Sequence, residues 1–307
     1  MRTLAARPGH IDRLRAPIAA LAPLAALLLL AGPARAGDGP ARRGPEWLGP
    51  EAPAHPRRVV SLAPSLTETV VALGLADRLA GVTRYDDAPE VARLPRVGGF
   101  LDPNPEAVLG LRPDLVLWLT DGGALGPVRK IAELGVPVRA LPVVTVADAL
   151  EAARLVGAAL GEPAAGARLA ERLGQALSAA RRRAGERPRV RVLLVVGREP
   201  LVVAGPGSYP DELLRLAGGR NAVEGGPPWP VFPLERAVAL DPDLVVDGAI
   251  DEPREGLSRL AAIPAVRRGA VHRLRSDAAL RPGPRLVEAL AELEAALDDS
   301  GRAGRSR

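Results

Sequence analysis

The sequence predicts an α/β protein made of two Rossmann-like lobes with parallel sheets, joined by one long helix. Short, nearly continuous apolar strands alternate with helical segments, the pattern of a parallel sheet covered on both faces. The phrase PNPEAVLGLRPDLVLWL at 103–119 also returns, shifted by 129 positions, as PLERAVALDPDLVVD at 233–247. A single long helical segment separates the two copies, which indicates a duplicated lobe.

The first lobe is predicted at 57–161, where strand and helix alternate. RRVVSLAP predicts a strand, and SLTETVVALG predicts a helix for which Ser65 and Glu68 have the spacing of a capping box. Asn104 and Thr145 are the expected N-caps of two later helices. The further elements are strands at about 79–83, 115–119 and 136–140, and helices from 105, at 126–134 and from 145 to 161.

One uninterrupted helix is predicted next, and we assign 162–186 to it. Leu169, Leu173 and Leu177 recur every four residues, and the stretch is much longer than a βα crossover needs. The second lobe, 187–307, then repeats the series of elements. It is expected to hold strands at 190–196, 201–203, 244–246 and 271–274, and helices at 209–217, 234–240, 254–260 and 284–298.

Residues 1–36 have the features of a cleaved secretory signal peptide. Arginines precede the apolar run LAPLAALLLLAG, and small residues at Ala34 and Ala36 form an A-x-A cleavage site. The apolar run is too short to cross about 30 Å of hydrocarbon as a helix. Residues 37–56, rich in Pro, Gly and Ala without a period, predict a flexible leader.

Charge and cysteine content exclude several classes of function. The formal charge of +5 falls to about +1 without residues 1–36, because that segment holds five arginines and one aspartate. The basic pI therefore does not indicate nucleic acid or an anionic membrane as a partner. The chain has no cysteine, which excludes thiol catalysis, Cys-ligated zinc, iron–sulfur clusters and the lipobox cysteine of lipid-tethered exported proteins.

The few aromatic residues suggest where a ligand could bind. Open α/β sheets bind ligands beyond the carboxyl ends of their strands, so two facing lobes would form a cleft lined by loops. Tyr85, Phe100, Trp229 and Phe232 all fall in predicted loops, where each could contact a flat ligand or plug the base of its loop. The ligand is favoured for Tyr85 and Trp229, the two alternatives are balanced for Phe100 and Phe232, and burial is favoured for Trp118.

Five motifs together resemble a known family. They are RVVSLAPSLTE, GVTRYDDAP, RVGGF with NPEAVLGLRPDLVL, the GGPPWP loop and RSDAALRPGPR, in this order between 57 and 296. The chain is similar to the class III periplasmic substrate-binding proteins of ABC importers, and specifically to their cobalamin-binding branch. The resemblance implies two lobes with a rigid connecting helix, no enzymatic activity, no resident cofactor, and delivery of cobalamin or a related corrinoid to a permease dimer. We expect an unlipidated periplasmic monomer that does not bind nucleic acid.

The resemblance also implies roles for individual residues. Tyr85 would lie against the corrin ring, Trp229 would be the aromatic of the second-lobe loop, and Asp277 and Arg281 would contact the nucleotide side of the ligand. Phe100 stands where relatives often have tryptophan. The expected ligand-binding set is Ser65, Tyr85, Phe100, Trp229, Asp277 and Arg281.

Glu106 and Glu235 match the two surface glutamates, one per lobe, that dock onto arginines of the permease. Each stands eight positions before the aspartate of the repeated phrase. A pseudo-symmetric pair of carboxylates can meet a two-fold pair of cations. The alternative is that each glutamate only complements the dipole at the first turn of a helix.

Two other functions are alternatives to this interpretation. A haem or ferric-siderophore binder of the same fold is the nearest alternative, with Tyr85 as an iron ligand and His272 more simply explained as a surface residue. An α/β enzyme is remote, because GPGSYP at 205–210 has Pro210 where a dinucleotide fingerprint needs glycine, and Ser208 explains the motif as an N-cap. No cluster has metal-ligand spacing, so no metal site is expected.

Overall fold

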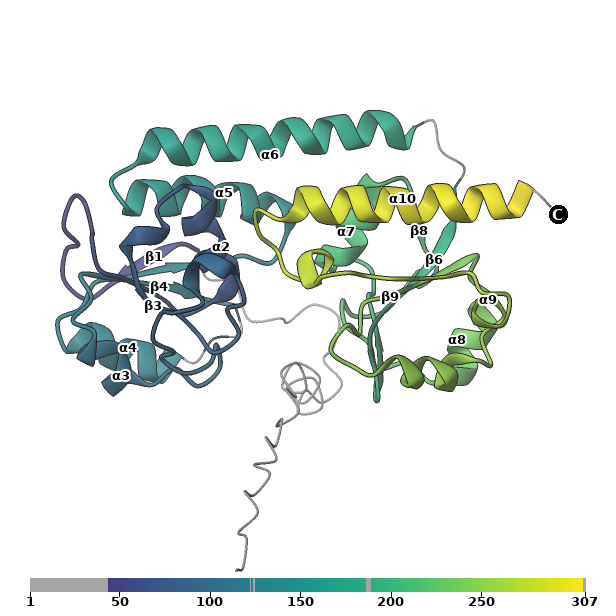
Figure 1. Ribbon diagram of the computed structural model, residues 1–307, viewed down its shortest axis with the longest axis horizontal. Coiled ribbons are helices and arrows are strands. Elements are labelled where there is room, and N and C mark those ends of the chain that lie inside the picture. Colours follow the sequence, from purple (N-terminus) through teal and green to yellow (C-terminus); the bar gives the residue numbers. More distant parts are fainter. Residues whose placement is uncertain (1–43, 122, 124, 186–188, 306–307) are drawn as a thin grey trace, which may run out of the picture.

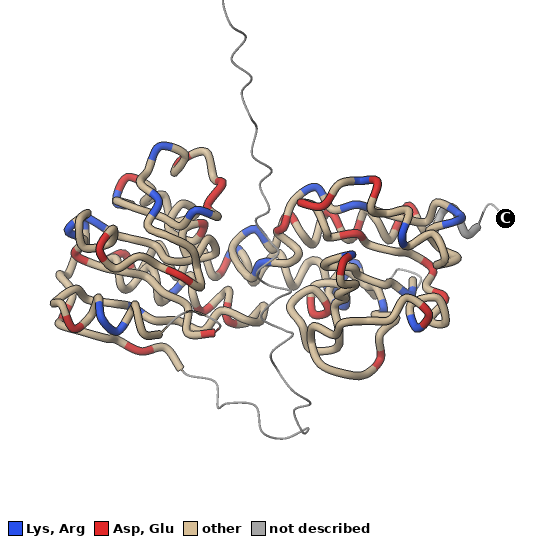
Figure 2. The backbone as a smooth tube through the Cα atoms, turned by 90° about the horizontal axis from the view of Figure 1, so that it is seen from below, with Lys and Arg blue, Asp and Glu red and all other residues tan. Residues whose placement is uncertain are grey.

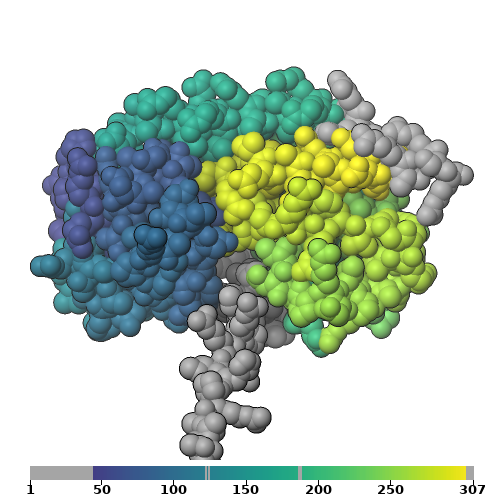
Figure 3. Space-filling view, viewed as in Figure 1, coloured from purple at the N-terminus to yellow at the C-terminus, as the bar shows by residue number. Residues whose placement is uncertain are grey.

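The computed structural model describes residues 44–121, 123, 125–185 and 189–305. Two α/β lobes lie side by side, and the 22-residue helix α6 (Pro163–Ala184) runs over both of them (Figure 1). The space-filling view shows the lobes in contact beneath this helix (Figure 3). The predicted fold class, two mostly parallel sheets with one long connecting helix, is confirmed.

The N-terminal lobe is a five-stranded sheet in the order β1-β5-β4-β2-β3, parallel except for β1. Side chains of α2 and α5 form the core on one face, and side chains of α3 and α4 form the core on the other. The elements are β1 (Glu46–Leu48), β2 (Val59–Ser61), α2 (Pro64–Ala72), β3 (Leu79–Gly81), α3 (Pro105–Gly110), β4 (Leu115–Leu119), α4 (Leu125–Glu133), β5 (Val138–Leu141) and α5 (Val146–Ala159), with 3-10 turns at Ala76–Arg78 and Pro89–Val91.

The C-terminal lobe has a sheet in the order β10-β9-β6-β7, with β8 also paired to β6. Strands β8, β9 and β10 are parallel to their neighbours, and β7 is antiparallel to β6. The elements are β6 (Arg191–Arg198), β7 (Leu201–Val203), α7 (Tyr209–Leu216), β8 (Arg220–Asn221), α8 (Leu234–Leu240), β9 (Leu244–Asp247), α9 (Pro264–Arg267), β10 (Val271–Arg273) and α10 (Leu286–Arg305), with 3-10 helices at Arg254–Leu260 and Asp277–Ala279. The helix predicted at 254–260 is thus of the tighter 3-10 kind.

The repeated phrase builds the same corner in each lobe. Asp114 accepts a hydrogen bond from the Arg58 backbone N–H at 2.9 Å, and Asp243 accepts one from that of Arg191 at 2.8 Å. The residue two positions before each aspartate has a left-handed backbone, with φ of 47° and 40°. The sequence repeat is therefore a repeat of local structure.

The predicted leader is wrong from residue 44 onward. Strand β1 pairs antiparallel with β5, and the Arg139 guanidinium lies 5.1 Å from the centroid of the Trp47 ring opposite it. Leu48 packs against the core of the N-terminal lobe. A three-residue edge strand is too short to show the alternation of apolar and polar residues that indicates a strand, and the surrounding Pro and Gly indicate a loop. Residues 37–43 and the predicted signal peptide lie outside the described residues.

The predicted capping box at Ser65 and Glu68 is also wrong. Helix α2 begins at Pro64, and its N-cap is Ala63, without a side-chain cap. Proline fits the first helical position, where its missing N–H has no intrahelical partner to lose, so the helix begins before Ser65. Ser65 and Glu68 consequently lie within the helix, and both are buried.

A close helix contact ties α6 to the N-terminal lobe. A Cβ on Gly157 would lie 2.7 Å from the Gly166 Cα, and a Cβ on Gly166 would lie 2.7 Å from the Ala153 carbonyl oxygen. Leu169 and Leu173 of α6 belong to a core that also contains side chains of α5, α7 and α10. This shared core connects the two lobes through more than the covalent chain.

Candidate functional site

Four charged side chains meet where the lobes touch, and we call them the interlobe cluster: Glu68, Asp277, Arg281 and Arg285. Glu68 lies on α2 of the N-terminal lobe, and the other three lie on or after the last 3-10 turn of the C-terminal lobe. Arg281 Nη1 donates to Glu68 Oε1 at 2.8 Å, and Arg281 also pairs with Asp277. Arg285 Nη1 lies 3.4 Å from Glu68 Oε1 and 3.2 Å from Asp277 Oδ1. Each arginine therefore contacts both carboxylates.

Backbone structure places the interlobe cluster. The Ser276 hydroxyl accepts from the Ala278 N–H and caps the short turn that begins at Asp277. The chain then passes over α2 at Gly283, where a Cβ would lie 3.3 Å from Glu68 Oε2 and 3.7 Å from Ser65 Cβ. The predicted residues Ser65, Asp277 and Arg281 are thus brought to one place.

The loop after β3 carries Tyr85 toward the same place. Asp86 holds this loop, because its Oδ2 accepts from the Thr83 backbone N–H at 2.7 Å and from the Thr83 hydroxyl at 2.6 Å. Tyr85 is partly exposed, and the next residue but one, Asp87, lies 4.0 Å from Arg281 Nη1. Tyr85 therefore sits on a loop that reaches the interlobe cluster.

Burial raises the pKa of three carboxyl groups in this region. Burial raises the pKa of Glu68, against the lowering effect of Arg281 and Arg285. Burial also raises the pKa of Asp86, against the hydrogen bonds from Thr83. Burial together with the charges of Asp277 and Asp87 raises the pKa of Asp251, which follows β9. Several carboxyl groups therefore lie close to one another in this region.

The aromatic candidates have different surroundings. Phe100 packs partly buried against the core of the N-terminal lobe. Phe232 is 3% exposed with the Arg236 guanidinium 4.5 Å from its ring, and Trp118 is 1% exposed, so burial is confirmed for Trp118. Trp229 is partly exposed in the loop before β-bridge residue Val231. Within the described residues no hydrogen bond or ion pair joins Trp229 to the interlobe cluster, so its ligand role stays a prediction.

Sequence reasoning missed Glu68, Arg285, Asp87 and Asp251. The sequence pattern predicts a capping role for Glu68, but helix α2 begins at Pro64, so Glu68 lies inside the helix. The motif RPGPR does contain both arginines of the cluster, and a basic pair in a loop that needs acidic partners was the signal available.

The two predicted docking glutamates lie on exposed helix N-termini. Glu106 on α3 has a side chain 74% exposed, with Oε1 3.4 Å from Lys130 Nζ; a backbone hydrogen bond and Lys130 lower its pKa. Glu235 is exposed on α8. Both helices lie on the side of the molecule opposite α6 (Figure 1). Figure 2 views the molecule from this side and shows acidic and basic residues interspersed over both lobes.

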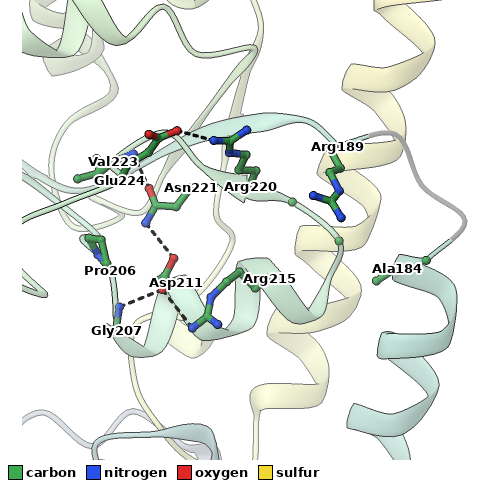
Figure 4. A pocket seen from close by; sticks show the side chains of 13 residues that line it. Ala184, Arg189, Pro206, Gly207, Asp211, Arg215, Arg220, Asn221, Val223 and Glu224 are labelled. Atoms are coloured by element: carbon green, nitrogen blue, oxygen red, sulfur yellow. Dashed lines mark hydrogen bonds and ion pairs between the residues drawn. The ribbon is translucent and has the colours of Figure 1, made fainter.

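A cavity of the C-terminal lobe, larger than a second one at the carboxyl ends of β9 and β10, lies away from the interlobe cluster. A cavity of about 830 Å³ lies in the C-terminal lobe, lined by Arg189, Arg215 and Arg220 (Figure 4). Asp211 beside it is fully engaged, since it accepts from the Gly207 N–H and the Asn221 amide, which explains its burial structurally. The predicted site residues Ser65, Asp277 and Arg281 converge at the interlobe cluster instead.

The smaller cavity lies closer to the predicted site. It has a volume of about 480 Å³ and is lined by 250–254 and 273–275, at the carboxyl ends of β9 and β10. Asp251 is one of its residues, and Asp277 follows the last of them by two positions. This is where an open α/β sheet places a ligand.

Other candidate chemistry is limited in the described part of the chain. His272 Nε2 lies 3.2 Å from Glu292 Oε1, a pair that joins β10 to α10. Across residues 44–305, apart from the undescribed positions, no group of three or more His, Asp or Glu could hold a metal ion. In the same residues, no helix combines the length and the apolar character needed to span a bilayer.

Comparisons with known proteins agree with this architecture. The sequence profile of the family described as periplasmic binding protein matches residues 59–278. A vitamin B12-binding protein of Vibrio parahaemolyticus is 26% identical over 240 residues, which cover 77% of this chain and 87% of that protein. The crystal structure of the periplasmic vitamin B12-binding protein BtuF of Vibrio cholerae matches with a TM-score of 0.70 and 26% identity, over 80% of this chain and 98% of that chain. The periplasmic haem-binding protein RhuT of a Roseiflexus species in apo form matches with a TM-score of 0.74 and 29% identity, over 80% of this chain and 99% of that chain. The chain therefore belongs to the periplasmic binding protein family and has the class III fold of these relatives.

Proposed function

We propose that the protein binds cobalamin or a related corrinoid between its lobes and delivers it to the permease dimer of an ABC importer, without enzymatic activity. The observation that carries the proposal is the convergence of Asp277 and Arg281 from one lobe with Ser65 and the Tyr85 loop from the other. The vitamin B12-binding relatives support the choice of ligand.

The chemistry of the junction suits a flat, polar-edged ligand. The Tyr85 ring, which has the Arg84 guanidinium 5.2 Å from its centroid, would supply an aromatic face to the ligand, and the cluster residues would supply hydrogen-bond donors and acceptors for side groups on the edge of a macrocycle. Helix α6 spans both lobes, so we expect preformed loops rather than a large hinge closure to hold the ligand.

Titration of the purified chain tests the ligand. Cobalamin, cobinamide, haemin and a ferric siderophore are added separately while the visible spectrum and the heat of binding are followed. We expect a shift of the corrinoid band with saturation at one ligand per chain and no conversion of the ligand. Flat titrations with both corrinoids would reject the proposal.

Haem is the second candidate ligand. The Tyr85 side chain is partly exposed, and a phenolate is a ligand that ferric iron accepts in proteins. The similarity to the haem-binding protein RhuT favours the same alternative. A Soret shift with haemin that is lost in Tyr85→Phe, alongside flat corrinoid titrations, would establish it.

Export completes the proposal. We propose that residues 1–36 are a signal peptide whose removal releases an unlipidated monomer into the periplasm. Mass spectrometry of protein from a periplasmic extract should give a chain beginning at Gly37. A retained N-terminus in the membrane fraction would contradict this.

A further inference from the structure

We propose that Glu68 is a specificity-determining positioning residue that neutralises Arg281 and Arg285 of the opposite lobe, so that the junction accepts amide-bearing macrocycles and rejects those with free carboxylates. This inference rests on the proposed function and names the ligand chemistry that the site selects.

The four side chains of the interlobe cluster pair with one another. Glu68 and Asp277 each contact both arginines, which gives four ion pairs among four side chains. The carboxylate side chains are 8% and 13% exposed, and the arginine side chains are 21% and 26% exposed. Arg281 and Arg285 favour the ionised form of Glu68, against burial, which raises its pKa. The positive charge of the arginines is therefore matched within the protein before any ligand arrives.

Two further carboxylates, Asp87 and Asp251, lie at the edge of the interlobe cluster. Asp87 has a side chain 73% exposed and lies 4.0 Å from Arg281 Nη1. Asp251 lines the cavity at the end of β9, and the charges of Asp277 and Asp87 act on it. With these two, four carboxylates face two arginines.

The groups just outside do not reverse this balance. Asp86 is acidic and held by Thr83, and Glu288 is acidic and bonds Arg285 Nε at 3.2 Å. Arg273 is basic, but its Nη2 is used by the Ile250 and Glu252 carbonyl oxygens, at 2.8 Å each. Arg254 and Arg275 also line the cavity that contains Asp251, so the excess of carboxylates is confined to the cluster itself, where Glu68, Asp277 and Asp87 face Arg281 and Arg285.

The charges of the interlobe cluster decide which ligand side groups can bind there. A free carboxylate on a ligand would have to displace Glu68 or Asp277 from the arginines, or lie beside Asp87 and Asp251. Both arrangements cost energy, because like charges repel at short range and a buried charge without a partner is costly. A primary amide can donate its N–H groups to the marginal carboxylates and accept from an N–H of Arg281 or Arg285, whose side chains are 21% and 26% exposed. The charge pattern thus separates amides from acids on the same kind of ring.

The test uses two ligands that share a corrin ring. Cobinamide carries amides on the ring periphery, and cobyrinic acid carries carboxylates there. Affinities for both are measured by titration with the wild-type chain and with Glu68→Gln, which keeps the shape of the side chain and removes its charge. We expect the wild type to prefer cobinamide by at least tenfold. Glu68→Gln should bind cobyrinic acid about tenfold more tightly than the wild type does, with a much smaller change for cobinamide.

Two further variants serve as a control and as a second test of the preference for cobinamide. Glu288→Gln removes another carboxylate partner of Arg285, but its side chain is 64% exposed and outside the cluster, so the preference should not change. Asp251→Asn, at the margin, should shift the preference in the same direction as Glu68→Gln, and it provides the test if circular dichroism shows that Glu68→Gln does not fold.

The outcomes separate this inference from the proposed function. Parallel weakening of both ligands in Glu68→Gln would show that Glu68 only supports the structure, and it would overturn the inference. A wild type that binds cobyrinic acid as tightly as cobinamide would also overturn it while leaving corrinoid binding in place. A wild type that binds neither corrinoid would remove the proposed function together with the inference.

Discussion

Asp86 illustrates how one buried carboxyl can hold a loop in place. Burial raises its pKa in the folded protein above the ordinary value near 3.9, so the folded state binds the proton more tightly than the unfolded state. Its stabilising contribution is therefore fully present below the ordinary pKa and is lost as the pH rises through the folded value.

We therefore expect the advantage of the wild type over Asp86→Asn, in free energy of unfolding, to shrink as the pH rises from about 3 to about 7. Each unit by which the pKa is raised corresponds to about 1.4 kcal/mol. Urea unfolding at a series of pH values measures the difference. An advantage that grows with pH would mean that charged Asp86 is the stabilising form.

Trp229 provides a residue-scale test of the aromatic platform. Trp229→Ala should weaken corrinoid binding by roughly 1–3 kcal/mol, the size expected for losing a large aromatic face against a flat ligand. Trp47→Ala is the matched control, because Trp47 lies on β1 at the edge of the sheet and stacks with Arg139. Calorimetry with an unchanged affinity in Trp229→Ala would exclude this residue as a platform.

Among the helices and strands, the close contact between α5 and α6 stabilises the packing of the connecting helix on the N-terminal lobe. Gly166→Ala places a Cβ 2.7 Å from the Ala153 carbonyl oxygen, so we expect it to lower the free energy of unfolding by about 1–3 kcal/mol, although alanine is the better helix former. Gly174→Ala lies on the same helix, and the nearest atom to its Cβ is Leu150 Cδ2 at 3.8 Å. That variant should gain up to about 1 kcal/mol. Denaturant unfolding of both variants measures the contrast, and equal stabilisation would mean that the helices separate at no cost.

At the scale of the whole molecule, the duplicated lobes present one exposed glutamate each on the side opposite α6. If Glu106 and Glu235 dock onto the permease, the double variant Glu106→Ala with Glu235→Ala should abolish uptake of the ligand, because it removes both of the carboxylates that would pair with the permease. Ligand affinity of the purified variant should stay at the wild-type level, since the glutamates lie outside the interlobe cluster. Glu171→Ala on α6 is the control on the far side, and normal transport by the double variant would exclude the docking role.

The elements that local patterns specify were predictable from the sequence. Asn104, Thr145 and Ser208 were each expected to cap a helix, and each accepts a hydrogen bond from a backbone N–H of that helix. The connecting helix expected within 162–186 is α6, Pro163–Ala184, and the expected bounds 234–240 are those of α8. Caps, helical periods and a repeated phrase depend on neighbours within one or two turns, which is why they can be recognised without the fold.

The order of elements, the duplication, the connecting helix and the family resemblance can therefore be recognised in the amino-acid sequence. The edge strand β1 of the first sheet and the pairing of Glu68 with Arg281, 213 positions away, become visible only in the folded chain. The physical reason is that both contacts join segments without a shared local pattern, and their energy comes from burial and charge pairing that exist only once the two lobes are in place.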